Sequence, residues 1–136
     1  MKKSTLKLQS IGNTLIMIRI SLWNKKIREF NKMLITIDTG ASVTTISKKL
    51  LYEIGYDFDE KNKSMISTAS GVEYVSQTII EKIQIGGFIL NDIPVYAHTF
   101  PEESFSLGVL GLNVLELFDI ELIFSKWLMV LKKIEE

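Results

Sequence analysis

One carboxylate stands at the end of an apolar, β-branched segment and directly before a glycine turn. Residues 34–37 read Leu-Ile-Thr-Ile, which is typical of a buried strand, and Gly40 ends that strand, so Asp38 enters a turn. Burial disfavours the charged form of a carboxylate, so an aspartate here is costly unless hydrogen bonds or a chemical role compensate. Thr39 supplies a hydroxyl, and Gly40 permits the close approach of another backbone or a ligand. This stretch is a candidate active-site turn.

The residues around this turn narrow its interpretation, because Asp-Thr-Gly alone is also compatible with an ordinary turn. At residues 34–42 the sequence resembles the retropepsin-like aspartic proteases, in which an apolar strand runs into Asp-Thr-Gly-Ala-Ser. A second feature of that family, two apolar residues and a glycine leading into a short helix, is matched at residues 109–115. The two features occur in the family's order, and the resemblance extends over residues 15–131.

The resemblance implies a fold and a set of site residues. The fold is all-β, a retropepsin-like acid protease barrel with one short helix and an active site at a twofold dimer interface. Asp38 is the catalytic residue, and Thr39 and Gly40 support the active-site turn. Leu110 and Gly111 pack behind Asp38 as structural support. Substrate binding is assigned to the cleft and to a hairpin flap, at Gly40, Ala41, Ser42, Thr68, Ala69, Ser70 and Gly71.

The chemistry requires more than one carboxylate. Peptide hydrolysis needs one group that takes a proton from water and another that gives a proton to the scissile bond. Two carboxylates about 3 Å apart share one proton, because both cannot ionise together, and the pair supplies both functions. The chain has a single Asp-Thr-Gly and is too short for a second lobe. We therefore expect an aspartic endopeptidase that forms a homodimer, pairs Asp38 with its own copy, and cleaves a peptide or protein substrate without a cofactor.

Two other interpretations are compatible with the sequence. A retropepsin-like dimer that no longer cleaves would act as a peptide-binding or assembly module, since a fold does not guarantee an activity. The complete Asp-Thr-Gly-Ala-Ser argues against this, whereas a flap with Gly71 as its one glycine argues mildly for it, because family flaps are often richer in glycine. A β-barrel protein with an accidental Asp-Thr-Gly would stay monomeric at high concentration.

Length and composition are those of one ordinary globular domain. The chain has 136 residues, of which 46% are hydrophobic and 24% charged. We treat residues 1–136 as a single domain in which residues 1–12 form a peripheral N-terminal extension. Sixteen basic residues balance sixteen acidic ones, which argues against a nucleic-acid partner. The sequence has no cysteine and a single histidine, His98, so no metal site is expected.

The apolar segments are too short to span a membrane. None approaches the roughly twenty residues that a membrane helix needs. Residues 15–22 include Arg19 and lack a small-residue cleavage site, so they do not form a signal peptide. We expect a cytoplasmic protein without membrane contact.

Alternating hydrophobicity and turn residues predict the strands that position Asp38. Residues 43–52 are compatible with a strand or a helical turn, and a short helix is expected to end near Leu117. Lys25, Lys26 and Arg28 fall at a hairpin tip, where solvated charge is the simplest interpretation. The predicted hairpins consist of residues 15–23 with 27–37, the two halves of 65–75, 79–85 with 88–96, and 120–124 with 127–131.

Overall fold

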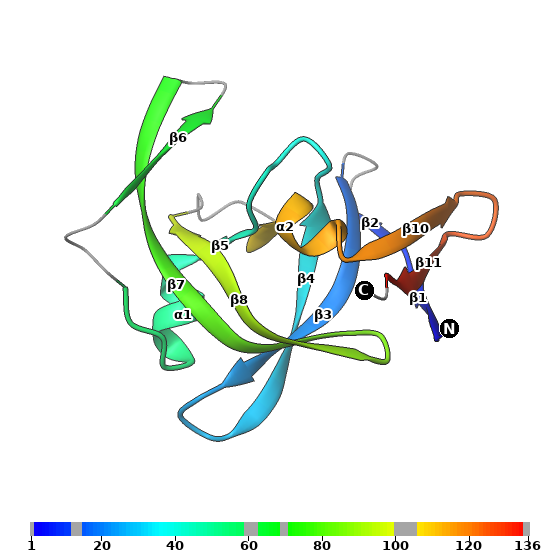
Figure 1. Cartoon of the computed structure of the whole chain (residues 1–136), viewed down its shortest axis with the longest axis horizontal. Coiled ribbons are helices and arrows are strands. Elements are labelled where there is room, and N and C mark those ends of the chain that lie inside the picture. Colours follow the sequence, from blue (N-terminus) through cyan, green and yellow to red (C-terminus); the bar gives the residue numbers. More distant parts are fainter. Residues whose placement is uncertain (1, 12–14, 59–62, 69–70, 100–105, 135–136) are drawn as a thin grey trace.

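The computed structural model in Figure 1 describes residues 2–11, 15–58, 63–68, 71–99 and 106–134. Most of these residues lie in strands, and two short helices complete the fold. The elements are, in chain order, β1 (Lys3–Lys7), β2 (Gln9–Ile11), β3 (Leu15–Asn24), β4 (Glu29–Ile37), β5 (Thr45–Ser47), α1 (Lys48–Glu53), β6 (Ser64–Thr68), β7 (Gly71–Ile85), β8 (Phe88–His98), β9 (Gly108–Leu110), α2 (Leu112–Leu115), β10 (Phe118–Ile123) and β11 (Leu128–Lys133).

The strands form a closed barrel with a small sheet beside it. Eight strands run in the order β2-β3-β4-β9-β5-β8-β7-β6, and an additional pairing of β3 with β7 closes the sheet on itself. The remaining strands form a sheet in the order β1-β11-β10, which lies on the side of the barrel where both termini are found (Figure 1). This architecture confirms the prediction of an all-β, barrel-like fold.

The structure resolves the segments that periodicity left undecided. The stretch after the Asp38 turn contains both predicted alternatives, because β5 runs directly into α1. The fold therefore has two short helices where the sequence predicted one. The predicted helix is α2, which ends at Leu115, slightly before the expected end near Leu117. At the N-terminus, β1 is an edge strand of the small sheet, and Leu8, which follows it, is only 5% exposed and belongs to the core.

Aliphatic side chains from alternating strand positions fill the barrel. Ile18, Ile35, Ile46 and Ile80 are fully buried, and each such side chain contributes about 1.5–3 kcal/mol by leaving water. In β8 the alternation shifts at the exposed residues Asn91 and Asp92, where Asp92 has a φ of 55°. After this irregularity Ile93, Val95 and Ala97 again point into the core. The buried strands hold the end of β4, and thus the turn after it, in place.

No helix in the described part of the chain combines the length and the apolar character needed to cross a membrane.

Candidate active site

The two motifs singled out from the sequence meet in the structure. β9 lies between β4 and β5, parallel to β4 and antiparallel to β5. Ile37, the last residue of β4, is the register partner of Leu110. The turn that leaves β4 must therefore pass the end of β9 to reach β5. As a result, residues from two distant parts of the sequence build one compact turn.

Asp38 is held at both its backbone and its side chain. Its amide N–H donates to the Leu110 carbonyl oxygen at 3.1 Å, and its carbonyl oxygen accepts from the Ala41 amide at 3.2 Å. The carboxylate atom Oδ1 accepts a hydrogen bond from the Gly40 amide at 2.9 Å. These contacts orient one oxygen of the carboxylate and leave the other without a constraint from this turn.

The expectation of a buried carboxylate is wrong for the single chain. Asp38 lies one position beyond the end of β4, and the residues Asp38, Thr39 and Gly40 are all exposed. Burial along β4 ends at the preceding residues, since Thr36 is buried and Ile37 only partly so. The Asp38 carboxylate therefore lies at the surface of the chain rather than in its core.

The residues after Asp38 differ in exposure. Gly40 is tightly fitted, because a Cβ atom there would lie 3.2 Å from Oδ1 of Asp38. Ala41 is half-buried and Ser42 is exposed. The structure thus brings Asp38, Thr39, Gly40, Ala41 and Ser42 together in one short turn at the surface.

Gly111 lies directly behind this turn. A Cβ atom at Gly111 would approach the carbonyl carbon and oxygen of Val43 to 2.6 and 2.7 Å and the carbonyl oxygen of Ala41 to 2.9 Å. No real Cβ atom makes such contacts with backbone. The neighbouring Leu110 is 1% exposed. Gly111 therefore packs closely against the turn, and Leu110 contacts it through the hydrogen bond from the Asp38 amide. Their role as structural support of the site stays a prediction.

Asn113 connects the turn to the rest of the barrel, and sequence analysis assigned it no role. Its Oδ1 accepts from both the amide and the hydroxyl of Thr44, each at 2.8 Å, and its Nδ2 donates to the Pro94 carbonyl oxygen at 2.8 Å. The Thr44 hydroxyl in turn accepts from the Gly111 amide at 3.0 Å. The one available signal was a lone amide side chain within the apolar helix Leu112–Leu115.

Replacing Asn113 by alanine is expected to lower the free energy of unfolding by about 2 kcal/mol, because Thr44 is fully buried and its amide would lose its partner. Chemical denaturation of wild type and variant measures this difference. Asn91→Ala, at an exposed position on β8, is the matched control and should change stability by less than about 0.5 kcal/mol. Equal stability of the Asn113 variant and wild type would contradict the structural role.

The hairpin expected to act as a flap is present. β6 and β7 pair in antiparallel register, with Thr68 opposite Gly71. Gly71 has a φ of 123°, which L-residues rarely adopt. Ala69 and Ser70 lie outside the described residues. In Figure 1 the hairpin extends beyond the barrel at the top of the view, the end at which the turn after β4 also lies.

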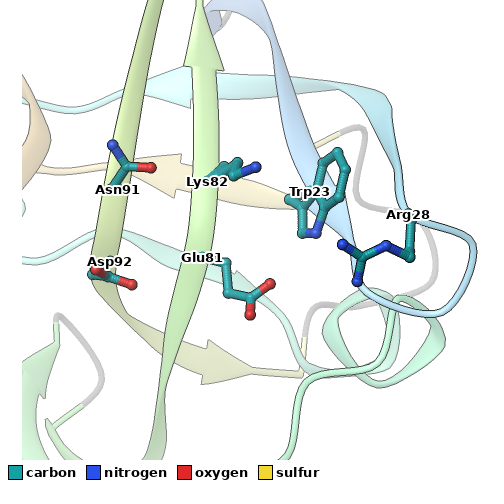
Figure 2. Close-up of a pocket in the computed structure, with 6 residues that line it drawn as sticks. All are labelled: Trp23, Arg28, Glu81, Lys82, Asn91 and Asp92. Carbon is teal, nitrogen blue, oxygen red and sulfur yellow. The ribbon is translucent and has the colours of Figure 1, made fainter.

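A polar pocket lies elsewhere on the barrel, and Asp38 is not among its lining residues. Figure 2 shows its lining, which comes from the β3–β4 hairpin and the adjacent strands β7 and β8. Its volume is about 310 Å³, and it contains none of the predicted site residues. No group of metal-ligating side chains occurs within the ranges that the structure describes. The lining residues are Trp23, Arg28, Glu81, Lys82, Asn91 and Asp92.

Comparisons with known proteins indicate the family and the fold of the chain. The family model described as gag-polyprotein putative aspartyl protease matches residues 26–117, which include the Asp38 turn and Gly111. No curated protein matches the chain. Among solved structures, a retropepsin-like aspartic protease from Rickettsia conorii superimposes with a TM-score of 0.66 at 19% identity, over 96% of this chain and 89% of that one. The chain therefore has a retropepsin-like fold and belongs to the gag-polyprotein putative aspartyl protease family.

Proposed function

We propose that this protein is a homodimeric aspartic endopeptidase in which Asp38 from each of two subunits activates one water molecule. The observation that carries the proposal is an exposed aspartate within Asp-Thr-Gly, oriented through its side chain by Gly40 and through its backbone by Leu110. Membership of an aspartyl protease family supports the same assignment.

A second subunit is needed because one carboxylate cannot act as acid and base together. In the proposed reaction the ionised Asp38 takes a proton from water, and the water oxygen attacks the carbonyl carbon of the scissile bond. The protonated Asp38 of the other subunit gives its proton to the carbonyl oxygen. One hydroxyl of the resulting tetrahedral intermediate then returns a proton to the ionised carboxylate. The other, protonated Asp38 gives its proton to the amide nitrogen, and the bond between carbon and nitrogen breaks. The pair again holds one proton.

Exposed apolar side chains support an interface next to the turn. Leu112 on α2 is 40% exposed, and Ile120 and Leu122 on β10 are 37% and 38% exposed. In the β10–β11 register, Ile120 faces Leu131 and Leu122 faces Met129, so these side chains share a sheet face with residues that are buried. An edge strand with an uncovered apolar face is suited to contact with another copy of the chain.

The substrate in this proposal is an extended peptide. Ala41 and Ser42 would line the cleft beside the paired carboxylates, and the Thr39 hydroxyls would brace the two turns across the axis. The β6–β7 hairpin, with Thr68 and Gly71 near its tip, would close over the peptide, whose backbone hydrogen-bonds as an added strand.

Mixing wild-type protein with the Asp38→Asn variant tests whether the site is shared. At a fixed concentration of wild type, increasing amounts of the variant should reduce peptide cleavage, because subunits exchange into mixed dimers that contain one Asp38. An equal excess of an Asp92→Asn protein, altered at an exposed acid away from the turn, should leave the rate undiminished. Unchanged cleavage in the presence of excess Asp38→Asn would show that each chain acts alone and would overturn the dimeric site.

A further inference from the structure

The tip of the β3–β4 hairpin is fixed against α1. The Lys25 amide donates to the Ile54 carbonyl oxygen at 2.9 Å, and the buried Tyr56 hydroxyl donates to the Trp23 carbonyl oxygen at 2.7 Å. At Gly55, a Cβ atom would lie 3.1 Å from Cβ of Lys25 and 3.2 Å from Cγ of Lys26. Lys25 and Lys26 are exposed, as expected for a solvated hairpin tip, and the backbone of this tip is fixed beside the helix.

Two adjoining grooves run along this contact, and we refer to them together as the α1 groove. Their volumes are about 400 and 710 Å³, and they share Tyr52 and Asp57. Among the described residues that line them, four are lysines and one is acidic. The first part is lined by Lys25, Lys26, Tyr52, Gly55, Tyr56 and Asp57, and the second by Lys48, Lys49, Tyr52, Asp57, Phe58 and Thr99.

Aromatic rings hold three of the lysine head groups along the α1 groove. The ammonium of Lys25 lies 5.2 Å from the centre of the Tyr56 ring, and that of Lys26 lies 5.4 Å from the Tyr52 ring. The ammonium of Lys48 lies 5.5 Å from the Phe58 ring. Such cation–π contacts restrict the positions of flexible side chains, so the positive charge is partly arranged before any ligand arrives.

Helix stability does not account for the lysines of α1. Lys48 and Lys49 occupy the first turn, which contains no acidic residue, although that end of a helix favours negative charge. On the same helix, the Tyr52 side chain is 66% exposed. Exposed tyrosine rings are common anchors in binding surfaces. Fixed positive charge beside such a ring favours a partner of the opposite charge.

We propose that the α1 groove binds an acidic, aromatic-containing segment of another polypeptide. The lysines would pair with carboxylates, and Tyr52 would pack against an apolar or aromatic side chain. Asp57 lines both parts of the groove. Its negative charge would repel the phosphate backbone of a nucleic acid, whereas its carboxylate can accept a hydrogen bond from a peptide N–H. The pocket of Figure 2 has no comparable preference, since its lining carries two positive and two negative side chains.

The α1 groove is separate from the candidate active site. In Figure 1, α1 and the β3–β4 hairpin lie toward the lower left, whereas the turn after β4, which contains Asp38, lies toward the top. An occupant would therefore be retained at a distance from the cleaved bond. This inference goes beyond the proposed protease function, because the groove can bind whether or not Asp38 hydrolyses peptides.

Binding is best measured with the full chain carrying Asp38→Asn, so that a lack of binding cannot be confused with a lack of cleavage. The probe is a fluorescein-labelled random copolymer of glutamate and tyrosine, followed by fluorescence anisotropy at low salt. Lys26→Glu combined with Lys49→Glu is expected to weaken binding by about tenfold or more. Lys7→Glu combined with Lys32→Glu, which makes the same charge change at exposed positions outside the α1 groove, should weaken it much less.

Further variants separate a loss of binding from a loss of folding. Circular dichroism must show that the charge variants fold, and Lys49→Glu alone, at an exposed position, provides a milder variant for the same titration. Tyr52→Ala should also weaken binding, because it removes the exposed ring without changing charge. Equal losses in the two double variants would overturn the site. Tighter binding of a single-stranded RNA homopolymer than of the acidic copolymer at matched salt would overturn the assignment to a polypeptide.

Discussion

Replacing Asp38 by asparagine is expected to abolish peptide cleavage and to leave the fold intact. Asparagine has the same shape and keeps a side-chain oxygen that can accept from the Gly40 amide. An amide cannot exchange a proton with water or with the scissile bond, so the loss should be on the order of a thousandfold or more. Because Asp38 is exposed, stability should change by no more than about 0.5 kcal/mol.

The measurement is incubation of both proteins with a diverse mixture of unfolded peptides over a range of pH, with the products identified by mass spectrometry. Asp92→Asn is the control for loss of one exposed carboxylate, and its φ of 55° is one that asparagine tolerates. Full activity of Asp38→Asn would remove the assignment of Asp38. A wild-type protein that binds peptides but cleaves none at any pH would favour the peptide-binding module instead.

Much of this fold could be predicted from local sequence. Alternating apolar residues and the Gly86-Gly87 turn predict the β7–β8 hairpin, and the hairpin that ends at Asp38 follows from the β-branched runs on either side of residues 24–28. These elements depend on neighbours in the chain, so the pattern of the sequence specifies them. The single-domain boundaries and the cytoplasmic location stay predictions.

The features that the sequence did not predict depend on long-range contacts. Asn113 and Thr44 are far apart in the chain, and their hydrogen bonds exist because β9 inserts between β4 and β5. The exposure of Asp38 likewise follows from where β4 ends against β9 rather than from the apolar run before it. Local periodicity contains no information about such contacts, whereas the family resemblance correctly indicated the fold in which they form.

Gly111→Ala is expected to be the most destabilising single-methyl change near the candidate site. Gly111 has a φ of −97°, which alanine adopts readily, so the effect is steric and not conformational. The added Cβ would approach backbone atoms of Val43 and Ala41 within 3 Å, and neither can move without moving the turn that contains Asp38. We expect a loss of about 3 kcal/mol in the free energy of unfolding. Thermal unfolding should show this as a decrease of about 10 °C in Tm.

The matched control is Gly87→Ala, in which the added Cβ would have Ser4 Oγ as its nearest neighbour at an ordinary 3.9 Å. That variant keeps the Gly87 amide that donates to Ser4 Oγ, and it should remain close to wild type in stability. If the Gly111 variant folds, its peptide cleavage should fall further than its stability predicts, because the displaced residues, Ala41 and Val43, continue the turn that begins at Asp38. A Gly111→Ala protein with wild-type stability and wild-type cleavage would mean that Gly111 does not pack closely against Val43 and the rest of the turn.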